Sequence, residues 1–223
     1  MRYLKLLLNN YKYYKQIKKL NIPVVNGNLH SSVYVKYPAE SNFNGKKVLN
    51  FGCGRAIYKA PNVLNVDTVG SEGVLVRDPS RSLAQFGKDF DFIIANHVME
   101  HLPDWFTTMK EFAEILKPGG VIEIWVPPIS SDAAFSYRDH LNRIGVDSFS
   151  GCKSSPRPGT NLLASQEFKD DLGEFKDLCM VERRNRPIIT WWTMVAPDSV
   201  MLWMTNHLRN IISEEAFIFR KLP

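Results

Sequence analysis

The sequence predicts an α/β fold in a single domain, built on a doubly wound, mostly parallel sheet of seven strands. Short apolar runs recur at 48–51, 63–66, 90–95 and 121–126, separated by turn-rich or helical stretches. This alternation is typical of a parallel sheet covered by helices. The 223 residues lie within the range of one large α/β domain, and no internal repeat divides them.

The first strand and the turn after it predict a ligand site. The apolar run 48–51 has the composition of a buried parallel strand, and Gly52 and Gly54 end it. Glycine has no Cβ atom, so the chain can turn sharply and a ligand can lie against the main chain. The next strand, 63–67, ends in Asp67, whose carboxylate can accept hydrogen bonds from two ribose hydroxyls. The layout predicts a nucleotide-type cofactor at the carboxyl edge of the sheet.

The spacing of this motif decides between two cofactors. A nicotinamide dinucleotide site has three glycines and an acid about 20 residues further on. Here Ile57 stands at the third glycine position and Asp67 follows Gly52 by 15 residues, which leaves little room for a long phosphate-binding helix. S-adenosylmethionine (SAM) has no phosphate and needs contacts only to its ribose, adenine and amino-acid parts. We therefore expect SAM; a nicotinamide cofactor and a turn without a ligand are the alternatives.

Composition fits a cytoplasmic protein. The chain is 44% hydrophobic and 12% aromatic, which supports a substantial core. Its three cysteines are odd in number and far apart, as in a reducing compartment, and indicate no metal cluster. The net charge of +5 suits solubility as well as it suits an anionic partner. No run approaches the ~18 apolar residues of a membrane span, and no signal peptide is visible.

Residues 1–45 are predicted to form a basic amphipathic helix and a connector. Residues 1–20 carry six basic side chains and no acid, and on a helix the aromatic and aliphatic residues face away from the lysines. Such a helix can lie on an anionic membrane surface, giving peripheral attachment. It can also pack on the domain or on a second subunit, and we favour packing because surface helices commonly show this pattern.

The remaining elements of the cofactor-binding core follow in order. Acidic or polar residues end two of the strands, and Pro103 and a Lys-Pro-Gly-Gly sequence bound the longest helix. We expect a third strand over 73–78 ending in Asp78, a short helix over 79–86, a fourth strand over 90–95 ending at Asn96 and His97, a helix from 103 to 116, and a fifth strand over 121–126.

Beyond residue 128 the pattern weakens. We expect a loop over 151–160, a sixth strand over 178–182 followed by three arginines, a late amphipathic helix over 200–211 and a final strand over 216–219. The domain, 46–223, accordingly divides into a cofactor-binding core (46–128), a substrate-side segment (129–175) and C-terminal strands and helix (176–223).

Tryptophans and arginines gather in the C-terminal part. They can form a wall on which a sugar or a base stacks, although a core role for the tryptophans and a solvated patch of arginines is the favoured interpretation. The residues concerned are Trp191, Trp192, Trp203, Arg183, Arg184 and Arg186.

Four pieces of the sequence resemble small class I SAM-dependent methyltransferases, which have a Rossmann-like fold. The pieces are Leu-Asn-Phe-Gly-Cys-Gly at 49–54, Asn-Val-Asp at 65–67, the segment 90–102 and Leu-Lys-Pro-Gly-Gly at 116–120. Most such enzymes carry an acid where this chain has Asn50. A subgroup common in bacterial surface-sugar metabolism reads Leu-Asn-x-Gly-Cys-Gly with a similarly short gap to the acid. The resemblance covers about residues 46–128.

The resemblance implies a set of cofactor-binding residues. The glycine turn admits the methionine part, Asp67 holds the ribose, Asp78 lies near the adenine amine, and Asn96 and His97 line the site at the tip of the fourth strand. A helix N-cap before Pro79 is the alternative role of Asp78, since Asp is a favoured cap residue. The full set is Asn50, Phe51, Gly52, Cys53, Gly54, Asp67, Asp78, Asn96 and His97.

The chemistry of methyl transfer suggests where catalytic groups are needed. The reaction is an in-line displacement, and holding the acceptor against the methyl group can remove about 7–11 kcal/mol of the barrier. A hydroxyl acceptor must also lose its proton, so a nearby base helps. Asp139-His140 loosely resembles an Asp-x-x-His element of the same subgroup. His140, oriented by Asp139, is therefore the first catalytic candidate and His97 the second.

Residues 97–101 also match His-x-x-Glu-His, a zinc peptidase pattern. Two histidines four residues apart on a helix can hold one metal ion. The helix would begin at a strand tip within a methyltransferase layout, and the sequence shows no third ligand. We therefore expect no metal site, and a pair of histidines that lines the pocket and packs the turn.

The motifs predict a SAM-dependent methyltransferase with a small-molecule or glycan acceptor, and the subgroup resemblance implies O-methylation of a saccharide or glycan precursor. One alternative is a SAM-binding or scaffold protein without turnover. Another is a nucleic-acid methyltransferase, suggested by the basic charge. No Asn-Pro-Pro-Tyr-type motif follows the fourth strand, which counts against methylation of base amino groups.

Overall fold

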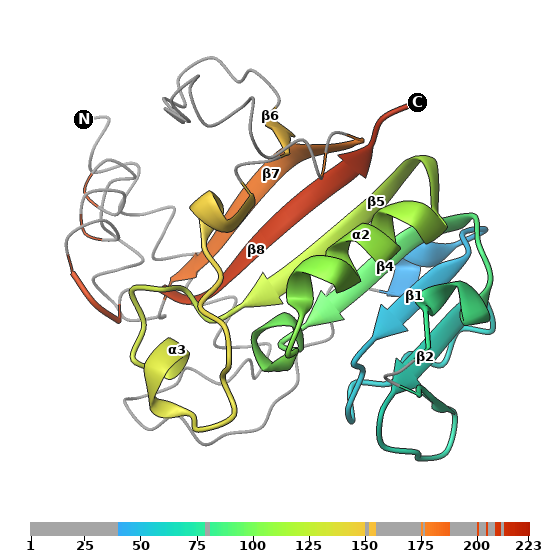
Figure 1. The fold of residues 1–223 in the computed structure, drawn as a ribbon, viewed down its shortest axis with the longest axis horizontal. Helices are drawn as coiled ribbons and strands as arrows, with labels where there is room; N and C mark the ends of the chain where they lie inside the picture. The colour runs from blue at the N-terminus through green and yellow to red at the C-terminus, as the bar shows by residue number, and fades with distance from the viewer. Residues whose placement is uncertain are drawn as a thin grey trace, which may run out of the picture.

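A computed structural model describes residues 40–78, 81–149, 152–154, 175, 177–187, 200, 204, 208–210 and 212–223. One sheet organises this part of the chain, in the order β3-β2-β1-β4-β5-β8-β7-β6 (Figure 1). The strands are β1 (Val48–Phe51), β2 (Val63–Asp67), β3 (Leu75–Val76), β4 (Phe90–Asn96), β5 (Leu116–Val126), β6 (Lys153–Ser154), β7 (Leu178–Pro187) and β8 (Ile212–Lys221). The helices are α2 (Trp105–Ile115) and α3 (Ala133–Ser136), with 3-10 turns η1 (Glu40–Phe43), η2 (Leu83–Phe86), η3 (Met99–His101) and η4 (Val146–Phe149).

The topology confirms the predicted fold class. Strands β1 to β5 pair in parallel, and β8 runs antiparallel between β5 and β7. The two-residue strand β6 lies at one edge of the sheet. The other seven strands have the order β3-β2-β1-β4-β5-β8-β7 and form a mostly parallel, doubly wound sheet. The carboxyl ends of β1, β2 and β4 therefore meet at one edge of the sheet.

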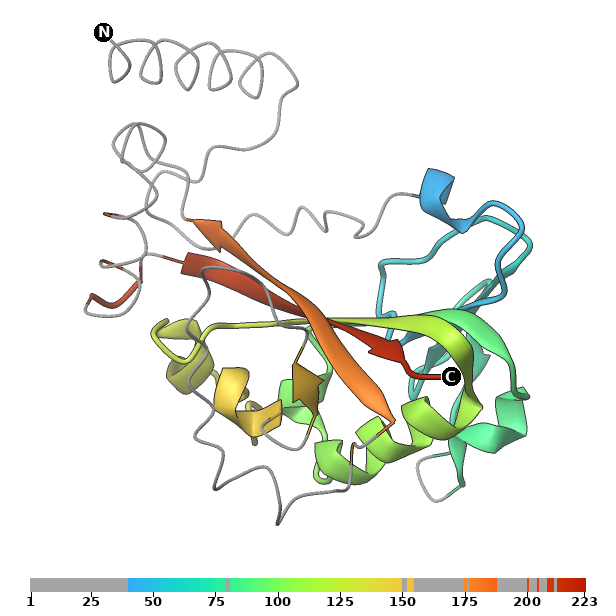
Figure 2. The same ribbon diagram turned by 90° about the horizontal axis from the view of Figure 1, so that it is seen from above.

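The core lies on both faces of the central strands, which is why β1 is buried along its whole length. The helix α2 lies on one face of the sheet (Figure 2). Its buried side chains Met109, Phe112 and Ile115 belong to the main core cluster. On the other face a smaller cluster forms around Phe43 and Tyr58. Burial on both faces is the expected environment of an uninterrupted apolar strand.

Several boundaries differ from the sequence expectation. The third strand is shorter, only β3, and the helix expected over 79–86 is reduced to η2. The helix α2 begins at Trp105, two residues after Pro103, because the Asp104 carboxylate caps it by accepting a 2.9 Å hydrogen bond from the Thr107 amide. The Lys-Pro-Gly-Gly sequence lies inside the long strand β5 at an irregularity in its pairing with β4.

The last two strands are longer than predicted. Strand β7 continues to Pro187, so the three arginines expected to follow it lie within it, and β8 covers ten residues. Both strands are longer than predicted because β7 and β8 pair with each other along most of their length. The helix expected over 1–20, the tryptophans at 191, 192 and 203, and most of the loop at 151–160 and of the helix at 200–211 lie outside the described residues. Within the described ranges, no helix has the length and apolar character needed to cross a bilayer.

Candidate cofactor and acceptor site

A cavity of about 590 Å³ opens at the carboxyl ends of β1 and β2. This volume lies within the ≈ 300–1,000 Å³ of small-molecule sites. The turns after β1 and β4, the end of β2 and the first turns of α2 form its walls. Prominent lining residues are Phe51, Gly52, Asp67, Arg77, Val98, His101 and Glu111. The structure thus brings three of the predicted cofactor residues, Phe51, Gly52 and Asp67, to one cavity.

Asp67 connects the two halves of the predicted motif. Its Oδ2 accepts a hydrogen bond of 2.7 Å from the amide of Gly54, and its Oδ1 accepts bonds from the Val69 amide (3.1 Å) and the Thr68 hydroxyl (3.3 Å). An ionised carboxylate has about four acceptor sites. The side chain lines the cavity, so it is both held by the main chain and able to accept a hydrogen bond from a ligand there.

The two glycines of the turn serve different needs. Both have positive φ, +62° at Gly52 and +50° at Gly54, a conformation that glycine adopts without cost. A Cβ atom at Gly52 would lie 2.2 Å from Cγ2 of Val98, whereas at Gly54 nothing in the described chain lies within 4 Å of the same position. Gly52 therefore lets the turns after β1 and β4 pack against each other.

Asn50 lies beneath the turn, in a buried amide network. Its Nδ2 donates to the carbonyl of Ala56 and to Oδ1 of Asn65, both at 2.9 Å. Asn65 in turn accepts from the amide of Tyr58 (3.0 Å) and donates to its carbonyl (2.9 Å). The side chain predicted to contact the cofactor thus fixes the loop between β1 and β2, and it does not line the cavity as described.

Phe51 and Cys53 flank Gly52 at the end of the first strand. The Phe51 ring packs edge-on against the Phe112 ring, with 5.1 Å between the ring centroids. The Arg77 guanidinium lies 4.9 Å from the centroid of the Phe51 ring. Arg77 also pairs with Glu111 at 4.0 Å. Cys53 is buried, and burial raises the pKa of its thiol to about 11, so the thiol stays neutral.

Asp78 follows β3 at the rim of the site. Its carboxylate lies 3.5 Å from Nε of Arg81, and about half of its side chain is exposed. Arg77 and Arg81 line the described cavity, and Asp78 does not. The described 3-10 turn η2 is capped by Ser82, whose hydroxyl accepts a hydrogen bond of 3.3 Å from the amide of Ala84, and residues 79 and 80, next to Asp78, lie outside the described residues.

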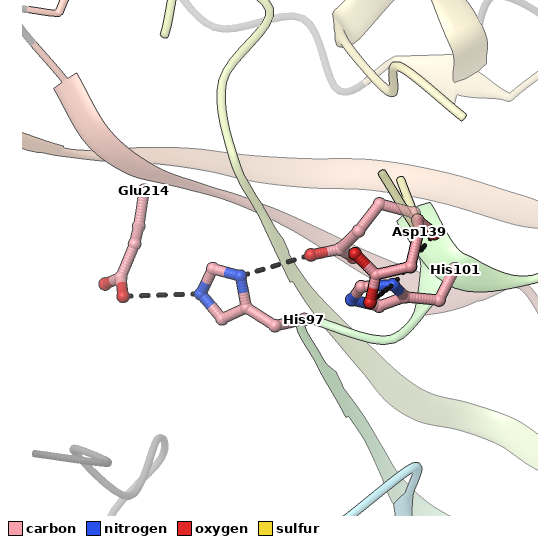
Figure 3. Close-up of polar contacts among 5 residues, drawn as sticks. His97, His101, Asp139 and Glu214 are labelled. Carbon is pink, nitrogen blue, oxygen red and sulfur yellow. Dashed lines mark hydrogen bonds and ion pairs between the residues drawn. The ribbon is translucent and has the colours of Figure 1, made fainter. Parts of the chain in front are cut away.

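Asn96 and His97 stand where β4 ends, outside the described lining of the cavity. His97 adopts φ +49°, and its ring lies between two carboxylates: Nδ1 is 3.2 Å from Oε1 of Glu100 and Nε2 is 3.3 Å from Oε1 of Glu214 (Figure 3). Desolvation opposes protonation, but the two carboxylates outweigh it and raise the pKa of His97 to about 9. The two carboxylates therefore favour the protonated form of the His97 ring, and the role of His97 as the second catalytic candidate stays a prediction.

His140, the first catalytic candidate, lies beside the turn after β4. Its ring centroid is 4.7 Å from that of His101, which lines the cavity. Burial lowers the pKa of His140, so its ring is neutral at neutral pH. Asp139 does not orient it as predicted: its Oδ2 lies 3.3 Å from Nδ1 of His101 instead (Figure 3).

Sequence reasoning missed several residues of the site. Arg77, next to the predicted Asp78, and Glu111, on the buried side of α2, form the ion pair at the cavity wall. Glu214 reaches His97 from β8, 117 residues later, and no local pattern signals such a contact. Val98 could have been suspected, because it comes two residues after β4, the strand whose turn must meet Gly52.

The residues present fit SAM. The cavity has the size of a small-molecule site, a carboxylate at the end of β2 faces it, and no phosphate cradle is needed. In such a site Asp67 would hold the ribose, and the wall of Phe51, Gly52 and Val98 would shape the rest of the pocket. When bound, SAM supplies an electrophilic methyl group on a sulfonium.

The strand order and the cavity at the carboxyl ends of β1 and β2 are those of the class I SAM-dependent methyltransferase fold. Residues 32–205 match a family model described as a methyltransferase domain, and the chain belongs to that family. SAM is the cofactor that membership implies.

The curated relatives share only part of this chain. A ubiquinone biosynthesis O-methyltransferase of Chelativorans sp. (strain BNC1) is 29% identical over 104 residues, covering 38% of this chain and 41% of that protein. A ubiquinone biosynthesis O-methyltransferase of Cereibacter sphaeroides is 26% identical over 100 residues, covering 36% of this chain and 40% of that protein. The match thus spans about two fifths of the length of these relatives.

Solved structures are similar over more of the chain. A SAM-dependent methyltransferase from Archaeoglobus fulgidus has 17% identity and a TM-score of 0.48, covering 80% of this chain and 88% of that one. The N-methyltransferase NodS from Bradyrhizobium japonicum WM9 has 15% identity and a TM-score of 0.43, and the match covers 81% of this chain and 90% of that one.

Proposed function

We propose that this methyltransferase transfers the methyl group to a hydroxyl, and that the acceptor is a saccharide or glycan precursor. The observation that carries the O-methylation proposal is the half-buried imidazole of His140, whose lowered pKa keeps the ring neutral and whose buried Nδ1 has no hydrogen-bond partner among the described residues. A hydroxyl must lose its proton as the new bond forms, and such a nitrogen can take it. The proposal is supported by the packing of the His140 ring against His101, a residue of the cavity wall.

Each residue has a distinct part in this proposal. Asp67 and the turn after β1 hold the methyl donor, and the β4 turn separates the donor from the acceptor side. His97, held between two carboxylates, positions Glu100 and so the segment that carries His101. His140 accepts the hydroxyl proton. SAM, when bound, would supply the methyl group from its sulfonium to the hydroxyl oxygen, with S-adenosylhomocysteine as the other product.

The saccharide assignment is supported by the subgroup resemblance of residues 49–54 and 65–67. A second candidate acceptor is a phenol, because the curated relatives are named ubiquinone biosynthesis O-methyltransferases. Both acceptors present a hydroxyl to the same base. A nucleic-acid acceptor and a binding protein without turnover are the competing functions.

The test is release of S-adenosylhomocysteine from SAM with a panel of acceptors: nucleotide sugars, free monosaccharides, a catechol carboxylate and transfer RNA. We expect turnover with a sugar, and a loss of about 10²–10⁴-fold in kcat for His140→Ala with unchanged SAM affinity. Arg138→Ala, an exposed change two residues away, should leave both unchanged.

Three outcomes would overturn the proposal. Turnover with the catechol alone would assign a phenolic acceptor, and turnover with RNA alone a nucleic-acid methyltransferase. SAM binding without turnover on any acceptor would favour the scaffold function.

A further inference from the structure

Three potential metal ligands converge beside the cavity. Glu100 and His101 come from η3, and His140 comes from the segment after α3; one ligand atom from each lies within 4.8 Å of the others. The two segments are joined by main-chain bonds, because the amides of Leu141 and Asn142 both donate to the carbonyl of Glu100 at 2.8 and 3.0 Å. The backbone therefore fixes the three side chains as one cluster.

Two atoms of this cluster are buried without a partner. Glu100 is 2% exposed, and its Oε2 has no hydrogen-bond partner in the described part of the chain. The same holds for Nδ1 of His140. Buried polar atoms are nearly always paired, so an unpaired carboxylate oxygen and an unpaired imidazole nitrogen in one cluster require an explanation. A cation between them would satisfy both.

The second polar atoms of Glu100 and His101 are held by residues outside the cluster, as in metal sites. Nδ1 of His101 lies 3.0 Å from the carbonyl oxygen of Asp139 and 3.3 Å from its carboxylate, which leaves Nε2 for an ion (Figure 3). Oε1 of Glu100 is occupied by His97. Histidine ligands usually donate their second nitrogen to a carboxylate or carbonyl in this way, which fixes the ring.

We propose that Glu100, His101 and His140 bind one divalent transition-metal ion of the zinc class. Two imidazoles and one carboxylate suit zinc, and they leave a coordination position open, whereas calcium and magnesium prefer oxygen ligands. Ligands at 2.0–2.2 Å from zinc lie closer together than 4.8 Å, so the side chains must close around the ion. This set differs from the His-x-x-Glu-His pattern of the sequence, because His97 turns to Glu214 and His140 supplies the third ligand.

A bound ion would replace His140 as the group that activates the acceptor hydroxyl of the proposed function, but the binding of the ion does not depend on methyl transfer. It would occupy the nitrogen that otherwise takes the hydroxyl proton, and its charge would acidify a hydroxyl bound at its open position. Because His101 lines the cavity, that position lies next to the acceptor side. Metal binding is measured directly, so its failure is distinct from failure of methyl transfer.

The test uses the full-length chain, treated with a chelator, dialysed and titrated calorimetrically with zinc chloride. We expect one ion per chain, and at least about 100-fold weaker binding in His101→Ala and in His140→Ala, with calcium and magnesium failing to compete. Asp139→Ala should weaken binding about 10-fold through loss of the outer contact. Cys179→Ser, which removes a thiol outside the cluster, is the control and should bind as wild type.

The cobalt-substituted chain gives a second readout, since cobalt bound by this ligand set absorbs visible light and the absorption should vanish in His140→Ala. Absence of zinc binding in the folded wild-type chain would overturn the proposal. Equal zinc affinity in wild type and both histidine variants would also overturn it.

Discussion

The carboxylate of Asp67, at the end of β2, accepts a 2.7 Å hydrogen bond from the amide of Gly54, in the turn after β1. This bond joins the two pieces of sequence from which the cofactor site was predicted. It shows why a gap of only 15 residues suffices: a short loop, not a long helix, connects β1 to β2. The acid that faces the cavity also holds the turn that borders it.

The two glycines of this turn should respond differently to alanine. Gly52→Ala forces a Cβ atom against Val98, so we expect a loss of about 2–4 kcal/mol in the free energy of unfolding from overpacking and positive φ together. Gly54→Ala faces open space and should lose only about 1 kcal/mol, from its φ. Urea denaturation measures both. The double variant Gly52→Ala, Val98→Ala should recover part of the loss; equal losses for the two single variants would contradict the packing role.

Asn50 is expected to act on stability and not on the cofactor. Asn50→Ala removes both bonds donated by its amide and leaves buried acceptors, so we expect a loss of about 1–3 kcal/mol in unfolding free energy. Asn44→Ala, an exposed change, should stay within about 0.5 kcal/mol. If Asn50→Ala weakened SAM binding with no change in thermal unfolding, Asn50 would be a cofactor ligand as the resemblance implies.

The Asp91 carboxylate should make a pH-dependent contribution to the free energy of unfolding. Burial acts to raise its pKa, but Lys117 and the Lys47 amide, which donates at 2.7 Å, outweigh it and hold the pKa below its usual value of 3.8. A depressed pKa contributes stability that is present above pH 3.8 and is lost as the pH falls through the folded-state value. We expect Asp91→Asn to cost about 1.5 kcal/mol at pH 7, and the difference from wild type to shrink below about pH 4.

The measurement for Asp91 is the free energy of unfolding between pH 3 and 7. Asp89→Asn is the matched control, because Asp89 is exposed and asparagine tolerates its positive φ. A difference that stays constant over this range would mean that the carboxylate contributes through its shape and not through its charge.

The central sheet could be predicted because its signals are local. The apolar runs that form β1, β2, β4 and β5 predict buried strands, and the Gly-x-Gly sequence predicts a sharp turn of the main chain. Contacts between distant segments could not be predicted this way. Glu214 meets His97 only because β8 returns beside β5, and His140 meets Glu100 only because the chain after α3 folds back onto η3. The partner of Asp139 was misassigned to its neighbour in sequence for the same reason.

Titration of SAM into the wild-type chain and into Asp67→Asn tests the central claim most directly, with Glu72→Gln, an exposed acid five residues further on, as the charge-matched control. Wild type and Glu72→Gln should bind one SAM per chain with equal affinity. Asp67→Asn should bind at least about 10-fold more weakly, since a hydrogen bond to a charged group is worth about 1.5–3 kcal/mol. A folded wild-type chain that takes up no SAM, or an Asp67→Asn variant that binds it as tightly as wild type, would contradict this account.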